Sequence, residues 1–210
     1  MKKILKNISF YHWFLVLSFT LVWIWAAINP VFPHDWLLEN YLIFIFVPVI
    51  LIYSYFHKLS DVSLGLITLF MMLHVVGSHY TYAHVPFGYT LEAWLHESRN
   101  MYDRLVHFAF GFLLFYPLLE IFEHWAGVKK FWGYYITFMT IAAFGGMYEV
   151  MEWMVGSVVD PEAGMAFLGA QGDIWDSQKD IWMGVLGALV AALLMFISKK
   201  LYTVSEFSKN

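Results

Sequence analysis

The sequence contains no cysteine, which excludes disulfide bonds and cysteine-based metal or redox chemistry. Charge is also scarce, because only 13% of the 210 residues are Asp, Glu, Lys or Arg. An ordinary globular chain carries roughly twice that share, about 25%. Apolar side chains take the place of charge, since 60% of the residues are hydrophobic and 20% are aromatic. This composition predicts a polytopic membrane protein.

The apolar residues are gathered in runs that are long enough to cross a bilayer, for which about 20 residues are needed. We predict six transmembrane helices, at about residues 10–28, 36–56, 62–85, 104–122, 132–154 and 179–198. The first run is too long for the core of a signal peptide and is predicted to be a membrane anchor. The expected fold class is therefore all-α, a polytopic membrane helix bundle that forms one integral-membrane domain over residues 1–210.

The distribution of basic residues predicts the orientation, because cytoplasmic loops are enriched in Lys and Arg. If both termini are cytoplasmic, the following nine residues lie inside: Lys2, Lys3, Lys6, Lys58, Lys129, Lys130, Lys199, Lys200 and Lys209. Only Arg99, Arg104 and Lys179 then lie outside. We expect a multi-pass protein of the bacterial inner (cytoplasmic) membrane, with its N- and C-termini in the cytoplasm.

The most unusual stretch is residues 172–180 (GDIWDSQKD), which leads into the last apolar segment. On a helix that turns about 100° per residue, Asp173, Asp176 and Asp180 fall within roughly 60° of one another. We call these three residues the aspartate stripe. Carboxylates on one stripe repel, so water, a cation or basic groups on other helices must hold them.

The predicted topology brings ionisable residues of other helices to the same membrane face as the aspartate stripe. Asp103 and His107 are spaced i,i+4 at the start of the fourth predicted helix, and Glu149 and Glu152 are spaced i,i+3 near the end of the fifth. His79 lies near the outer end of the third. Helix bundles build metal sites from carboxylates and histidines on facing helices in this way. Oxygen ligands suit Mg²⁺ or Mn²⁺, and added imidazoles favour Mn²⁺ or Zn²⁺.

We therefore predict a polar site that opens to the periplasm and holds a divalent metal such as Mg, Mn or Zn. The predicted metal ligands are Asp173, Asp176, Asp180, Glu152 and His79. His107 and Glu149 are predicted to be catalytic, and Arg104 to pair with a substrate phosphate. A metal held here can activate water against an ester or phosphate. The hypothesis is a metal-dependent hydrolase or transferase that acts on a lipid or envelope precursor.

Simpler interpretations remain open. Acidic side chains at helix ends can extend into headgroups or water, and Asp103 with Arg104 can be an ordinary helix start. A transporter or proton-coupled channel is an alternative, but the deep half of the predicted bundle carries few ionisable groups apart from His74. A third possibility is an accessory membrane protein without a site of its own. Beyond the lipid bilayer and such a substrate no partner is predicted, and in particular no nucleic acid.

Four motifs together resemble the YjdF-type family of bacterial inner-membrane proteins. They are residues 77–82 (GSHYTY), 103–108 (DRLVHF), 149–152 (EVME) and 169–180 (GAQGDIWDSQKD), and the likeness covers essentially the whole chain. The family has no assigned reaction. The resemblance therefore implies a multi-pass inner-membrane location and no particular chemistry.

A weaker resemblance is to VanZ-like membrane proteins. Those proteins have a basic residue and a histidine at the start of one helix, an acid near the end of the next, and a final Asp-x-x-x-Asn before glycines. Here Arg104 and His107 are in comparable places, but Asp180 stands where that pattern has Asn, and the glycine spacing differs by one. The role of VanZ-like proteins in glycopeptide resistance is therefore not transferred.

Overall fold

The computed structural model describes residues 9–159, 168 and 170–207, with side chains described as far as residue 198. Within these ranges the regular secondary structure is helical, with no strand. The helices are α1 (Phe10–Ala27), α2 (Pro33–Phe56), α3 (Asp61–His79), α4 (Pro86–Leu95), α5 (Tyr102–His124), α6 (Phe131–Val158) and α8 (Asp176–Phe207). The all-α fold class is confirmed.

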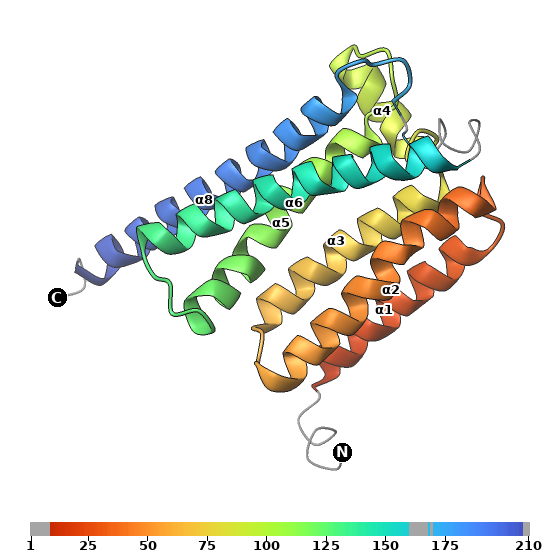
Figure 1. Cartoon of the computed structure of the whole chain (residues 1–210). Helices are drawn as coiled ribbons and strands as arrows, with labels where there is room; N and C mark the ends of the chain where they lie inside the picture. Colours follow the sequence, from red (N-terminus) through yellow and green to blue (C-terminus); the bar gives the residue numbers. More distant parts are fainter. Residues whose placement is uncertain (1–8, 160–167, 169, 208–210) are drawn as a thin grey trace.

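The long helices alternate in direction along the bundle (Figure 1). α1, α3 and α6 end, and α2, α5 and α8 begin, at one end of the bundle, which we call the site face. The short helix α4 lies at this same end, between α3 and α5 (Figure 1). Chain segments that are about 100 residues apart in sequence therefore meet at the site face.

Five of the described helices, α1, α2, α3, α5 and α8, are long and apolar enough to cross a membrane by length and composition. α6 has 28 residues and packs against α5 and α8, but it carries Glu149 and Glu152 and is not among the five. Large apolar side chains such as Phe14, Leu51 and Leu193 are more than half exposed on the outer surface of the bundle. Such surface suits hydrocarbon rather than water, so the polytopic membrane bundle is confirmed.

α5 and α8 form the most extensive helix pair of the bundle. Their backbones approach closely because glycine faces backbone at the crossing. A Cβ atom added to Gly111 of α5 would overlap the carbonyl oxygen of Gly184 on α8, and one added to Gly187 would overlap the carbonyl of Phe108. Small residues allow this kind of approach in membrane helices. The crossing places the first turns of both helices beside each other at the site face.

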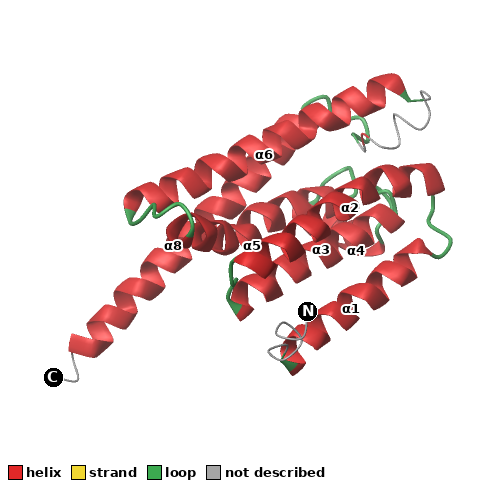
Figure 2. Cartoon of the chain, turned by 60° about the horizontal axis from the view of Figure 1, so that its bottom comes forward, coloured by secondary structure: helices red, strands yellow, loops and turns green. Residues whose placement is uncertain are grey.

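α1 and α2 pack against α3 on the other side of the bundle, as Figure 2 shows from below. Their apolar contacts are joined by buried polar ones. Asn40 of α2, which is fully buried, accepts a hydrogen bond from the indole nitrogen of Trp23 at 2.8 Å and lies 3.4 Å from the hydroxyl of Ser78. These bonds tie the site-face half of α2 to α1 and α3.

The structure ends α3 at His79, whereas the predicted third helix continues to residue 85. The chain turns here because the Gly77 carbonyl accepts the backbone N–H groups of Tyr80 and Tyr82, at 3.1 and 2.8 Å. Thr81 and Tyr82 both have φ of 53°, in the left-handed region, which a helix cannot continue through. The turn brings the Tyr82 ring against Gly77, where a Cβ would collide with it.

The predicted helices leave two connecting segments at the site face, residues 86–103 and 155–178, and the structure differs from the prediction in both. Residues 86–103 are predicted as a loop, but Pro86 occupies the first turn of helix α4, where proline is favoured. In the second loop, residues 155–178, α6 continues to Val158 and α8 already begins at Asp176. Residues 160–167 and 169 of this loop lie outside the described residues.

Candidate functional site

Arg104, in the first turn of α5, lies at the centre of a buried ion-pair cluster. Its side chain is only 5% exposed. Nη2 lies 2.7 Å from Oδ1 of Asp176 and 3.2 Å from Oδ2 of Asp173, and Nη1 pairs with Oδ2 of Asp180. The guanidinium also donates to the Asp176 carbonyl oxygen at 3.2 Å. One arginine thus contacts all three residues of the aspartate stripe.

Two further basic side chains complete the cluster. Arg99, just before α5, pairs with Asp176 and lies 3.6 Å from Asp103 and 4.0 Å from Asp173. Lys179 donates to Oδ2 of Asp173 at 2.7 Å. The sequence left water, a cation or basic groups as possible partners of the aspartate stripe, and basic side chains contact all three residues, with Asp180 held through one oxygen only.

Asp173 lies at the outer edge of this cluster, before the first residue of α8. The hydrogen bond from Lys179 is the main reason that the pKa of Asp173 falls to about 2, and the backbone N–H of Trp175 contributes next. Donors that bond a carboxylate favour its charged form. Asp173 is therefore a permanent anion in the physiological range.

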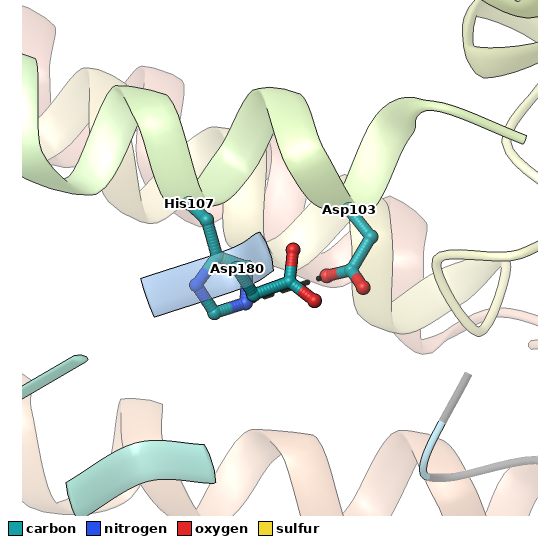
Figure 3. A group of neighbouring side chains, drawn as sticks. All are labelled: Asp103, His107 and Asp180. Atoms are coloured by element: carbon teal, nitrogen blue, oxygen red, sulfur yellow. Dashed lines mark ion pairs between the residues drawn. The ribbon is translucent and has the colours of Figure 1, made fainter. Parts of the chain in front are cut away.

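A second group of acidic and imidazole side chains lies beside the ion-pair cluster. Asp103, His107 and Asp180 each offer a ligand atom, and these atoms all lie within 4.8 Å of one another. Figure 3 shows the three side chains converging from α5 and α8. Asp180 is 2% exposed, and while its Oδ2 pairs with Arg104, its Oδ1 has no hydrogen-bond partner. A buried carboxylate oxygen without a donor is costly, so this group calls for a cation or a proton.

α6 adds Glu149 and Glu152 to this group. Oε1 of Glu149 lies 3.4 Å from Nε2 of His107, which is itself 3.5 Å from Oδ1 of Asp103. Glu149 is 5% exposed, and its Oε1 has no hydrogen-bond partner. Glu152 is half-buried and close enough for its charge to interact with those of Glu149, Asp103 and Asp180. The structure thus brings Glu149, Glu152, His107 and Asp180 together from three helices.

His79 is placed elsewhere. Its ring packs on Trp25 at a centroid distance of 4.6 Å, and its Nδ1 donates to the Ala26 carbonyl oxygen at 3.0 Å. Because it is committed to the contact between α3 and α1, His79 does not join the described group around His107. Its position gives it a packing role and no observed link to the other predicted ligands.

A buried carboxylate on α2, Glu39, extends the polar region. It is 3% exposed and accepts a hydrogen bond from the Tyr148 hydroxyl of α6 at 3.0 Å. Nε2 of His74 donates to the Glu39 backbone carbonyl oxygen at 3.1 Å, because a carbonyl can only accept. Nδ1 of His74 then accepts a hydrogen bond from the Tyr82 hydroxyl. A continuous polar chain therefore runs from α3 through α2 to the helix that carries Glu149.

Sequence reasoning missed Glu39, Tyr148 and the role of Arg99. Asp35 and Glu39 are spaced i,i+4 on α2, the same spacing that identified Asp103 and His107, and both are 3% exposed. That i,i+4 spacing was the signal in the sequence that could have identified Asp35 and Glu39 as candidate site residues. Their burial could not be recognised because it depends on how α2 packs against α3.

The two loops at the site face are joined by a clamp between Asn100 and Gln171. The Asn100 backbone N–H donates to Oε1 of Gln171 at 2.9 Å, and Nε2 of Gln171 returns a bond to the Asn100 carbonyl at 3.3 Å. Asn100 is 1% exposed and also donates to the Val85 carbonyl at 2.9 Å. This clamp fixes Arg99, the preceding residue, against Asp176.

Acidic groups outnumber basic ones in this region. The carboxylates of the described site are Glu39, Asp103, Glu149, Glu152, Asp173, Asp176 and Asp180, whereas the permanent cations are Arg99, Arg104 and Lys179. Four carboxylates therefore exceed the basic groups. Buried charges must be compensated, and a divalent cation next to His107 would compensate two of the four. Bound in this way, a cation could polarise an ester or phosphate oxygen.

Comparisons with known proteins agree with this membrane bundle. A family model described as "Predicted membrane protein (DUF2238)" matches residues 11–200. The chain is similar to "Inner membrane protein YjdF" of Escherichia coli (strain K12), with 33% identity over 181 residues that cover 85% of this chain and 86% of the relative. No solved structure matches. These findings confirm the first of the two resemblances, and the weaker one, to VanZ-like proteins, is not shown by them.

Proposed function

The chain belongs to the DUF2238 family of membrane proteins and is a multi-pass protein of the bacterial inner membrane; from this premise we propose a metal-dependent hydrolase or transferase. Its substrate would be a lipid or envelope precursor, and its site would open to the periplasm. The whole chain would form a single integral-membrane domain. The proposal rests on one observation, the convergence of Asp103, His107 and Asp180 within 4.8 Å beside a buried carboxylate oxygen that lacks a donor.

The geometry supports a division of roles within the site. Asp103, His107 and Asp180 are the proposed ligands of one divalent cation, because two carboxylates and an imidazole suit Mn²⁺, Zn²⁺ or Mg²⁺. Glu149 lies beside His107, and its Oε1, which accepts no hydrogen bond, is where a general base for the attacking water would be needed. Glu152 would add negative charge that strengthens cation binding.

Arg104 receives a different role from the predicted phosphate contact. Its donors are occupied by the three carboxylates of the aspartate stripe, and its side chain is only 5% exposed. We therefore assign it as a positioning residue that orients Asp180 towards His107. Mutation of a group that holds a ligand carboxylate in place typically lowers metal affinity about 10- to 100-fold.

The proposed reaction needs one proton-transferring side chain, which Glu149 would provide, and the proposed cation. Glu149 takes a proton from water, or from an acceptor hydroxyl in a transferase, while the oxygen attacks the phosphorus or carbonyl carbon of the substrate. The bond to the leaving oxygen then breaks, and that oxygen takes the proton from Glu149. The cation would supply Lewis acidity to both steps.

A transporter or channel is less well supported. The deeper core of the described bundle, away from the site face, is largely apolar, with Leu113, Phe115, Leu119 and Ile141 fully or nearly buried. A conduction pathway normally needs polar groups along its length. The described polar chain from Glu149 to His74 instead runs sideways, within the half of the bundle that carries the site.

Metal analysis of the purified protein tests the proposal. We expect about one divalent ion per chain after purification without chelators, and a loss of at least about tenfold in Mn²⁺ affinity for Asp180→Asn, which removes the negative charge of a proposed ligand. Asp173→Asn is the matched control, because this residue of the same stripe is paired with Lys179 and should leave Mn²⁺ affinity nearly unchanged. A wild-type protein without stoichiometric metal and without saturable Mn²⁺ binding would refute the metal-dependent function.

A further inference from the structure

Helix α4 carries an exposed apolar stripe that the proposed function does not use. Phe87, Leu91, Trp94 and Leu95 are spaced i, i+4, i+7 and i+8, so they lie along one side of the helix. Phe87 is 49% exposed, Trp94 70% and Leu95 57%, whereas Leu91 is half-buried. We call these four residues the α4 stripe. A ten-residue helix with this surface must meet something apolar.

The edge of α4 that borders the α4 stripe, on the side of Leu91 and Leu95, is fixed to the protein. Gly88 is buried against Asn100, whose side chain occupies the space where a Cβ would lie. The Gly88 carbonyl accepts the backbone N–H of Met101 at 3.3 Å, and Asn100 donates to the Val85 carbonyl at 2.9 Å, just before the helix. The α4 stripe therefore cannot turn inward without breaking these contacts.

The position of α4 in the chain decides what the stripe meets. α3 ends at His79 and α5 begins at Tyr102, and both are candidate membrane spans, so the segment between them lies where hydrocarbon gives way to headgroups. Ten residues of helix are about 15 Å long, too short to cross a bilayer of roughly 30 Å. The helix ends in a left-handed residue, His96, and the polar residues Glu97 and Ser98 follow it.

We propose that α4 is an interfacial helix that lies in the plane of the membrane at the site face, with the α4 stripe inserted among the lipids. A lipid surface fits better than a protein partner because α4 connects two candidate membrane spans, α3 and α5, and so lies at the level where hydrocarbon gives way to headgroups. Trp94, its most exposed member, is a residue type that concentrates at this depth of a bilayer. The proposal does not depend on metal binding or catalysis.

The contacts of Asn100 give this anchoring a consequence for the site. The same residue holds Gly88 of α4 and clamps Gln171, and its neighbour Arg99 pairs with Asp176. Embedding α4 in the lipid surface therefore fixes the loops of the polar site at headgroup level. A substrate whose reacting group is presented by a membrane lipid would reach the site without leaving the bilayer.

The absence of cysteine makes the test direct, since an introduced cysteine is the only one in the chain. Trp94→Cys and Leu95→Cys, each spin-labelled in vesicles of phosphatidylethanolamine and phosphatidylglycerol, report the α4 stripe. Glu97→Cys, just past the helix, reports the water side. Both stripe positions are exposed, so these changes leave the core intact, and either one alone is sufficient if the other variant is poorly produced.

Collision rates with oxygen, which partitions into lipid, and with a water-soluble nickel chelate give the result. We expect the oxygen-to-nickel ratio to be several-fold higher at Trp94→Cys and Leu95→Cys than at Glu97→Cys. Ratios at the two stripe positions as low as those of a water-exposed label, with frequent nickel collisions, would show that the stripe faces water and overturn the proposal. Stripe labels that neither reagent reaches would overturn it as well, because they would show a protein partner such as a second copy of the chain.

Discussion

Removing the Arg104 guanidinium tests how the aspartate stripe is held. Arg104→Met keeps much of the apolar stem but removes the donors that Arg104 itself offers to Asp173, Asp176 and Asp180. Asp176 retains Arg99 and Asp173 retains Lys179, so the main loss falls on Asp180, which is 2% exposed. Oδ1 of Asp180 already has no hydrogen-bond donor. In the variant, Oδ2 would also lose its partner, the Arg104 guanidinium.

The size of the effect follows from the burial of the pair. Breaking a buried ion pair by removing one partner costs about 3–5 kcal/mol, because the remaining charge is left uncompensated. For a domain of 150–250 residues, 1 kcal/mol lowers the Tm by about 2–4 °C. We therefore expect the unfolding temperature of Arg104→Met to fall by roughly 6–20 °C.

Tryptophan fluorescence provides the assay, because the chain has 10 tryptophans. Thermal unfolding in detergent should be followed for the wild type, Arg104→Met, Asp180→Asn and the double variant, all with chelator present so that no metal contributes. If the two residues form a coupled pair, the double variant loses less stability than the sum of the single variants by at least about 1 kcal/mol. Strictly additive losses, or a Tm change below about 2 °C for Arg104→Met, would refute the assigned ion pair.

Two other properties can be checked in the same protein. Because the pKa of Asp173 is lowered from 3.8 to about 2, its stabilising contribution is complete above pH 3.8 and is lost as the pH falls towards 2. The wild type should thus lose more stability between pH 5 and pH 2.5 than Asp173→Asn does, and parallel pH profiles of the unfolding temperature would contradict this. The proposed orientation predicts that a C-terminal green fluorescent protein fusion is fluorescent while a C-terminal alkaline phosphatase fusion is inactive. The reverse pattern would place the site face in the cytoplasm.

The helical fold follows from the sequence because its signal is local. Apolar runs of about 20 residues identify membrane helices whatever their neighbours are. Helix α4 was not recognised because a ten-residue helix lacks such a run, although Pro86 and the spacing of the α4 stripe were visible. The end of α3 depends on the turn at Thr81 and Tyr82, which both have a left-handed backbone. Neither residue type predicts that conformation from the sequence.

The candidate site could be recognised only in part, because pairing depends on which helices face one another. The spacing of the aspartate stripe showed that the charges needed partners, but not that Arg104 and Arg99 supply them. His79 lies only a few residues from the site-face turn, yet the rotation of α3 directs it to Ala26. Glu39 is hidden for the same reason, since its burial is decided by the packing of α2.

The glycine crossing of α5 and α8 has a consequence for mechanical precision. Gly111 is four residues from His107, and Gly184 is four residues from Asp180, so the pivot lies about 6 Å from the proposed ligands along each helix. A rocking of the two helices by about 5° about that pivot would move the ligand positions by only about 0.5 Å, which is the tolerance that a binding site can accept. Because the crossing lies so close to the proposed ligands, the distance between Asp180 and His107 would change little when the two helices move.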